Sequence, residues 1–182
     1  MLYVVDEVSG VTVLDNIMYV VCYESSTIRL YNTDTHSPLD VIINVDGMKA
    51  PRDIVVCRDD RQLYVADCDM GIWRVSVAHQ SYVWWLSTPS TTDRFTIRTM
   101  SMTSQRLLVT SWWQPRLRQY STTDRPQLLR VIELPQYMRQ VYHGVETTRG
   151  TFLVSHLSTS WNDEKHAVSE LFSFFCCFII TM

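Results

Sequence analysis

The sequence contains no cluster of basic residues and no long apolar segment, and both absences limit what the protein can do. Of its 182 residues, 16 are Lys or Arg and 19 are Asp or Glu, which gives a formal net charge of −3. A nucleic-acid surface normally needs clustered positive charge, so nucleic acid is not an expected partner. No stretch reaches the roughly 18 apolar residues of a membrane span, so none is predicted. Residues 1–6 lack the basic and apolar regions of a signal peptide.

The sequence also lacks a cysteine pattern and an Asn-x-Ser/Thr sequon. The five cysteines are odd in number and show no CxxC spacing. Cys57 and Cys68 fall near opposite ends of an expected hairpin, on the order of 20 Å apart at ~3.3 Å per residue. That separation is too large for a disulfide. These features favour a reducing compartment, so a cytoplasmic location is expected.

No stretch keeps the 3.6-residue period of a capped amphipathic helix. Instead, one strand-like pattern recurs four times, at residues 18–21, 63–66, 107–110 and 152–155, at intervals of 45, 44 and 45 residues. Repeats of about 40–50 residues that hold several short strands are typical of propeller blades. The sequence therefore predicts an all-β fold, a β-propeller of about four blades.

The second repeat shows how each blade is built. Apolar runs at 54–57, 63–67, 72–75 and 82–86 are separated by polar or Gly-containing turns, which predicts four antiparallel strands. The other repeats follow the same order. The expected blades cover residues 10–46, 51–87, 95–134 and 141–171. In the fourth blade, the third strand is expected at 167–171, after a solvated loop at 163–166.

Residues 50–56, 63–67 and 72–75 together resemble an NHL repeat, in which a Pro and an apolar strand precede a "YVAD" strand and a hydrophobic-x-x-aliphatic strand. The family usually has six blades. Two architectures therefore stay open. The chain is an incomplete six-bladed propeller, or it closes as four blades with residues 2–6 as the outer strand of the last sheet.

The last residues, 172–182, break the repeat pattern, because they are apolar and uncharged. They are too short to span a bilayer. Three readings remain: an outer strand, a membrane-associating segment, or sequence foreign to the propeller.

The strongest candidates for partner binding are aromatic and Arg residues on loops. In a propeller, the loops between the second and third strands lie on the same face as the connections between blades. That face is expected to carry Trp112, Trp113, Arg116, Trp161 and Arg52. Trp and Arg dominate interaction hot spots, so the face is expected to bind a protein or peptide. The alternative is that Trp112 and Trp113 pack between blades.

Two residues of the NHL-like motif, Tyr64 and Asp67, are expected to be structural. The resemblance implies that the Asp67 carboxylate accepts hydrogen bonds from loop N–H groups, as Asp does in turns. The alternative is a ligand or a catalytic acid.

No catalytic residue, metal site or cofactor is predicted. The repeats place Cys22, Asp67, Ser111 and His156 at equivalent positions, and this mixed set does not resemble a metal site. Known catalytic motifs are absent.

The function expected is therefore a non-catalytic interaction module. The resemblance adds a context, because many NHL domains end ubiquitin-ligase chains, although this sequence has no RING or B-box pattern. The alternatives are a propeller hydrolase or lyase with a channel metal, and an RNA-binding NHL domain.

Overall fold

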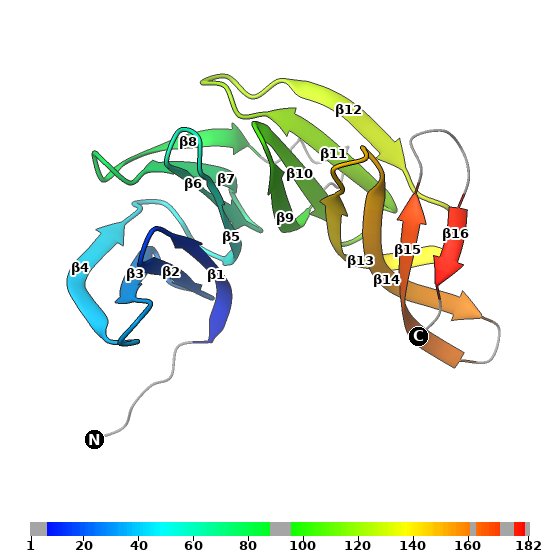
Figure 1. Ribbon diagram of the computed structural model, residues 1–182, viewed down its shortest axis with the longest axis horizontal. Helices are drawn as coiled ribbons and strands as arrows, with labels where there is room; N and C mark the ends of the chain where they lie inside the picture. The colour runs from blue at the N-terminus through cyan, green and yellow to red at the C-terminus, as the bar shows by residue number, and fades with distance from the viewer. Residues whose placement is uncertain (1–6, 88–95, 161–162, 172–176, 181–182) are drawn as a thin grey trace. The chain divides into compact units, whose positions relative to one another are not determined.

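The computed structural model of the protein describes residues 7–87, 96–160, 163–171 and 177–180. Their regular structure is entirely β: sixteen strands form four antiparallel sheets of four strands, each in chain order (Figure 1). The predicted fold class, an all-β chain of four-stranded propeller blades, is confirmed. We call the sheets blades 1 to 4.

The strand bounds are as follows. Blade 1 contains β1 (Val8–Leu14), β2 (Ile17–Cys22), β3 (Thr27–Asn32) and β4 (Pro38–Asn44). Blade 2 contains β5 (Pro51–Cys57), β6 (Gln62–Asp67), β7 (Gly71–Ser76) and β8 (Ser81–Ser87). Blade 3 contains β9 (Ile97–Thr103), β10 (Arg106–Ser111), β11 (Arg116–Ser121) and β12 (Leu128–Glu133). Blade 4 contains β13 (Met138–Glu146), β14 (Phe152–Ser160), β15 (Asp163–Leu171) and β16 (Cys177–Ile180).

The chain divides into two compact units, Met1–Thr88 and Pro89–Met182. The first unit contains blades 1 and 2, and the second contains blades 3 and 4. Each unit is described by itself below.

The turns between the first two strands of the four blades differ in length but share one backbone feature. One residue in each has a positive φ: Asp15 (53°), Arg61 (54°), Ser104 (50°) and Gly150 (76°). A left-handed residue in a tight hairpin turn matches the twist of the flanking strands. Each repeat therefore places one positive-φ residue in this turn.

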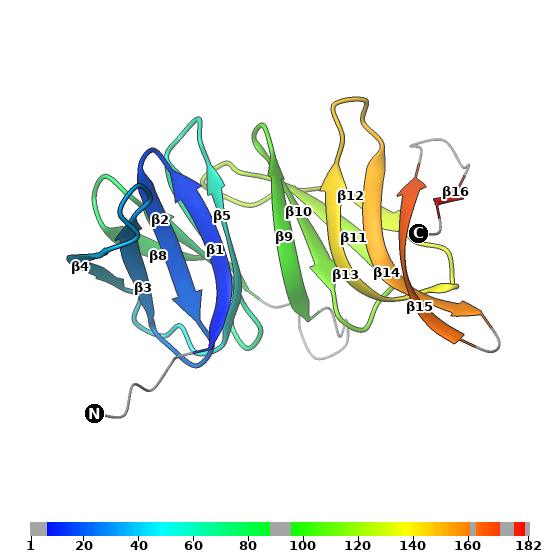
Figure 2. The same cartoon turned by 60° about the horizontal axis from the view of Figure 1, so that its bottom comes forward.

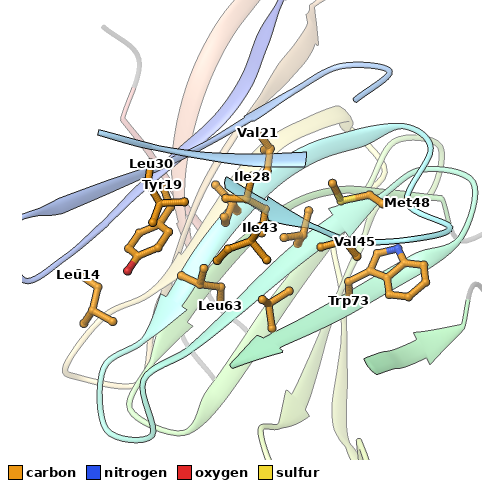
Figure 3. Packing of buried hydrophobic residues seen from close by; sticks show 13 residues of the cluster. Leu14, Tyr19, Val21, Ile28, Leu30, Ile43, Val45, Met48, Leu63 and Trp73 are labelled. Atoms are coloured by element: carbon orange, nitrogen blue, oxygen red, sulfur yellow. The ribbon is translucent and has the colours of Figure 1, made fainter. Parts of the chain in front are cut away.

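The core of the first unit lies between its two blades. Side chains from β2 and β3 of blade 1, including Tyr19 and Ile28, form one buried cluster with Leu63 of blade 2 (Figure 3). Val65 of blade 2 belongs to the same cluster. The inner strands are rich in β-branched residues, which suit a sheet covered on both faces. The other labelled members are Leu14, Val21, Leu30, Ile43, Val45, Met48 and Trp73.

The second unit has an equivalent core between blades 3 and 4. Leu108 and Leu117 pack with Phe152, Val154 and Leu171. Figure 2 shows β13, β14 and β15 as long, neighbouring strands of blade 4.

Hydroxyl side chains of β9 also join the two blades of this unit. Thr99 Oγ1 donates to the Tyr142 carbonyl (3.0 Å), and Ser101 Oγ donates to the Gly144 carbonyl (2.7 Å). These polar contacts fix how the two inner strands lie against each other, because each hydroxyl reaches one particular carbonyl.

A buried charge cluster completes this interface. The Glu146 side chain is 5% exposed and lies 2.6 Å from Arg130 Nη2. Gln119 Nε2 donates to its second oxygen at 2.6 Å, and Gln119 Oε1 accepts from Arg130 Nε at 2.7 Å. The carboxylate is thus paired and hydrogen-bonded, which a buried charge requires.

Blade 4 corrects one detail of the sequence analysis. Residues 163–166 were expected to be a loop, and this is wrong, because β15 begins at Asp163 and pairs with β14 as far as Ser160. The pairing satisfies backbone groups that an isolated loop would leave to water. Part of the apolar tail, β16, pairs with β15 in the outer position of this sheet. Residues 2–6 lie outside the described residues.

Candidate interaction surface

Two arginines occupy the same place in blades 2 and 3. The strand register puts Pro51 opposite Asp67 and Ile97 opposite Ser111. The residues that follow, Arg52 and Arg98, are therefore equivalent. Both guanidinium groups lie over aromatic rings: Arg52 is 4.1 Å from the centre of the Tyr23 ring, and Arg98 is 3.7 Å from that of Trp112.

In the second unit this contact extends into a continuous row of rings. Arg98 also lies 4.1 Å from the centre of the Tyr142 ring, so its guanidinium group contacts two aromatic rings. Trp113 meets Trp112 edge-on at 6.1 Å, and His166 lies 5.2 Å from Tyr142. We call these five residues the aromatic row.

The aromatic row is exposed at both ends, at Trp113 and at His166, and anchored in the middle. Trp113 is 70% exposed and Trp112 is 37% exposed. Arg98 is partly buried, and its Nη1 donates to the Val141 carbonyl at 3.1 Å. A cation between rings is attracted to both π-faces, so Arg98 holds Trp112 and Tyr142 in place. The row therefore offers flat aromatic surface that a partner can cover.

The loop that carries the two tryptophans is tied at both ends. Trp112 N donates to the Thr96 carbonyl (3.1 Å), and Arg116 N donates to the Gln114 carbonyl (2.7 Å). Arg116 itself begins β11 and lies 3.5 Å from Glu133. The backbone thus presents the Trp side chains from a short, hydrogen-bonded turn.

In the first unit, Asp67 supports the equivalent turn. The carboxylate is fully buried. Its Oδ2 accepts from the backbone N–H groups of Lys49 (2.6 Å) and Ala50 (3.3 Å), and its Oδ1 from those of Asp69 (2.9 Å) and Met70 (3.1 Å). These contacts are those of a turn-organising Asp. Tyr64, three residues earlier, is fully buried against Trp85.

Arg52 has a second contact next to Asp67. Its Nε donates to Cys68 Sγ at 3.3 Å. Burial raises the pKa of the Cys68 thiol, and the nearby Arg52 opposes this shift. A thiol with a raised pKa is mostly protonated at neutral pH, so Cys68 is a poor nucleophile.

The residues at the positions equivalent to Asp67 do not share one chemical role. His156 occupies this position in blade 4 and is 1% exposed. Its Nδ1 donates to the Leu157 carbonyl (3.0 Å) and its Nε2 contacts the Ser169 hydroxyl (2.9 Å). Ser169 is fully buried, so a substrate cannot reach this Ser–His pair. The described part of the chain contains no group of three or more His, Cys, Asp or Glu residues suited to a metal.

The residues predicted from the sequence to bind a partner lie only partly on this surface. Trp112 and Trp113 lie together in the aromatic row, Arg116 lies on the adjoining strand, and Arg52 belongs to the first unit. Trp161 lies outside the described residues. Arg98 was not predicted, although the repeat could have revealed it as the counterpart of Arg52. Tyr142 and His166 carried no such signal.

Solved structures with similar folds are distant in sequence. Hydrazine synthase of Kuenenia stuttgartiensis matches 90% of this chain and 50% of its own chain, with 14% identity and a TM-score of 0.67. A chain of a nidogen/laminin complex matches 91% and 60%, with 12% identity and a TM-score of 0.69. U3-55K matches 96% and 52%, with 8% identity and a TM-score of 0.70.

These likenesses establish the fold alone. The chain has a β-propeller fold of four blades. It spans between 50% and 60% of the length of the three chains above. No protein-family model matches the sequence, and the search of curated proteins gave no match.

The described residues include no helix that could cross a membrane.

Proposed function

We propose that this protein is a non-catalytic interaction module of the NHL type, which binds a protein or peptide on the aromatic row of its second unit. The observation that carries the proposal is the exposure of Trp113, at 70%, beside a Trp112 that Arg98 holds in place. When a partner covers a large apolar ring that is exposed to water, the free energy of the complex is lowered.

The composition of the aromatic row supports binding rather than packing. Trp, Tyr and Arg are the residues most often found at interaction hot spots. The Arg98 contacts with Trp112 and Tyr142 fix these rings before a partner arrives. Groups that are already ordered lose less conformational entropy on binding, so the interface can be tighter.

We place the module in the context that its NHL-like motif suggests, as the partner-recognition part of a ubiquitin-ligase-type assembly in the cytoplasm. The odd number of cysteines and the lack of CxxC spacing in the sequence favour a reducing compartment. One chain with a similar fold belongs to a complex of nidogen and laminin. That protein shares only the fold with this chain.

A peptide-selection experiment tests the proposal. A random peptide library displayed on phage is selected on the immobilised protein, and the affinities of the selected peptides are measured for variants. Trp113→Ala is expected to weaken binding at least ~10-fold, which is about 1.4 kcal/mol. Trp84→Ala is the matched control, because Trp84 is a 51% exposed tryptophan in the first unit.

The result that contradicts the proposal is also defined. If the selected peptides bind Trp113→Ala and Trp112→Ala as tightly as the original protein, the aromatic row is not the binding surface. If Trp84→Ala causes the larger loss, the surface lies in the first unit instead.

A further inference from the structure

A second group of aromatic rings lies in the first unit, on the outer part of blade 2. Tyr82 and Trp84 share one face of β8, because side chains two residues apart in a strand point the same way. Trp73 lies opposite Trp84 on β7 and contacts both rings. Its ring centre is 6.1 Å from that of Tyr82 and 6.4 Å from that of Trp84. We call these three residues the ring cluster.

The ring cluster is formed within the first unit. Trp73 belongs, together with Met48, to the core that blades 1 and 2 share (Figure 3), and Tyr82 packs against that core. The face of blade 2 that carries the rings is therefore turned toward blade 1. All three rings, and the groups that hold them, come from this unit.

The two outer rings are each held by a hydrogen bond. Trp84 Nε1 donates to the Met70 carbonyl at 2.8 Å, and the Tyr82 hydroxyl donates to Asp46 Oδ2 at 2.8 Å. The hydrogen bond to Asp46 raises the pKa of the Tyr82 phenol, so this group is neutral at physiological pH. Rings that are already fixed lose little conformational entropy when a ligand covers them.

A carboxylate lies at the edge of the ring cluster. Asp46 precedes Gly47 in the connection between β4 and β5. Gly47 approaches the rings closely, because a Cβ added there would lie 3.2 Å from Trp73 Cη2. Asp46 is exposed and accepts its hydrogen bond from a neutral phenol. Such a bond does not neutralise a carboxylate, so the edge of the cluster keeps a negative charge.

Trp84 presents ring surface that the fold does not require. It stacks on Trp73 at an interplanar angle of 26°, and it is 51% exposed whereas Trp73 is 6% exposed. At the equivalent position on β4, blade 1 has Ile42, which is also 51% exposed. An aliphatic side chain is thus sufficient at this position of a blade, and the indole of Trp84 adds a flat π-surface next to Asp46.

We propose that the ring cluster and Asp46 form a binding site for an arginine side chain of a partner peptide. The guanidinium group stacks on the exposed face of Trp84, and its N–H groups donate to the Asp46 carboxylate. A cation is attracted to the face of a Trp ring, and hydrogen bonds between charged groups are stronger than neutral ones. The negative charge of Asp46 complements that of the guanidinium group.

Arginine fits this site better than other organic cations do. A planar guanidinium covers a flat ring and offers a rigid fork of N–H donors, whereas the ammonium group of lysine is a compact, strongly hydrated charge. A trimethylammonium group has no N–H to donate to Asp46, and it binds best inside a cage of several rings. In the ring cluster Trp84 is exposed, while Tyr82 is partly buried and Trp73 is buried.

An NMR titration of the full chain tests the proposal. The probe is the peptide acetyl-Gly-Gly-Arg-Gly-Gly-amide, and the readout is the indole N–H signal of Trp84. Trp84→Ile identifies this signal among those of the six tryptophans. The arginine peptide is expected to shift the signal saturably. The same peptide with citrulline, a neutral group of similar shape, is expected to bind at least ~10-fold more weakly.

Variants of the first unit assign the contacts. Asp46→Asn is expected to weaken arginine binding at least ~10-fold, because it removes the charge and keeps the shape. Asp34→Asn is the matched control, since Asp34 is exposed at the opposite end of β4, roughly 20 Å away at ~3.3 Å per residue. It is expected to leave binding unchanged.

Trp84→Ile removes the π-surface and carries the residue type that blade 1 has at this position, so it is expected to fold and to lose arginine binding. Saturation transfer from the protein to the peptide measures binding to this variant. Circular dichroism checks that each variant keeps its β-structure.

Four results overturn the proposal. The Trp84 signal does not shift saturably with the arginine peptide, or the citrulline peptide binds equally well. Asp46→Asn binds as tightly as the original protein, or a trimethyllysine peptide binds more tightly than the arginine peptide. Failure here and failure at the aromatic row are distinguishable, because the two sites belong to different units and are measured with different peptides.

Discussion

Asp67 and Ser111 occupy the same position in blades 2 and 3, at the end of the second strand, opposite Pro51 and Ile97. Both are fully buried, but their surroundings differ. The Asp67 carboxylate accepts hydrogen bonds from four backbone N–H groups. The Ser111 hydroxyl has no hydrogen-bond partner. The side chain at this blade position therefore supports the following turn in blade 2, whereas in blade 3 the turn is held by backbone hydrogen bonds at Trp112 and Arg116.

Replacing these two residues by Ala is expected to have unequal effects. Asp67→Ala leaves four N–H groups without their acceptor, and we expect the free energy of unfolding to fall by about 3 kcal/mol. Ser111→Ala removes an unsatisfied hydroxyl and is expected to change it by less than about 0.5 kcal/mol. Urea titrations followed by circular dichroism measure both. Equal losses would show that the Asp67 hydrogen bonds do not stabilise the fold.

The buried carboxylate of Glu146 leads to a second prediction. Glu146→Gln keeps the shape but removes the charge that pairs with Arg130 at 2.6 Å. Breaking a buried pair leaves a charge without its partner, although the Arg130 side chain is 35% exposed and can still reach water. We expect a loss of about 2 kcal/mol in the free energy of unfolding.

The matched control for Glu146 is Glu133, which forms an exposed ion pair in the second unit. Glu133 lies 3.5 Å from Arg116, and its side chain is 66% exposed. Glu133→Gln is expected to cost less than about 1 kcal/mol. If the two variants are equally stable, the buried cluster contributes no more to the free energy of unfolding than a surface ion pair does.

The repeat explains how much of the fold could be predicted. Strands at 63–67 and 72–75 were expected, and β6 (Gln62–Asp67) and β7 (Gly71–Ser76) lie there. Short apolar runs between polar turns indicate buried strands, because both faces of an inner strand are covered. The start of β15 at Asp163 was not predictable in this way, because its polar residues pair through the backbone.

The aromatic row shows the other limit of sequence reasoning. Trp112 and Trp113 were predicted because adjacent tryptophans on a loop are conspicuous. The contact between Tyr142 on β13 and His166 on β15 depends on how the side chains of these two strands pack on either side of β14. Neither residue type nor spacing encodes that contact, so only the three-dimensional packing reveals it.

His143 makes stability depend on pH. Its Nδ1 lies 3.1 Å from Thr99 Oγ1, and burial lowers the pKa of the imidazole below its ordinary value. The folded state thus binds fewer protons than the unfolded state once the pH falls below about 6.5, the unfolded value. The free energy of unfolding should therefore decrease as the pH falls through that range.

His143→Gln is the variant that tests this. It removes the titrating group, so its stability should change less than that of the original protein between about pH 7.5 and about pH 5.5. Urea midpoints at the two pH values give the comparison. If both proteins lose the same stability on acidification, His143 is not the group responsible.

Gly10 and Gly150 are both expected to resist substitution, for different physical reasons. A Cβ added at Gly10 would lie 2.8 Å from Asp53 Cα and 2.8 Å from Ile54 N, both backbone atoms of the adjoining blade. A Cβ at Gly150 would meet nothing within 4 Å, but its φ is +76°.

We expect Gly10→Ala to be the more damaging change. Backbone atoms cannot move aside without shifting β5 against β1, so a loss of about 2 kcal/mol is expected, as for an overpacked core. Gly150→Ala should cost about 1 kcal/mol, because only the left-handed conformation opposes the side chain. Thermal unfolding of both variants measures the order. The reverse order would mean that blades 1 and 2 can separate at little cost, and the close approach of β1 to β5 would not contribute to stability.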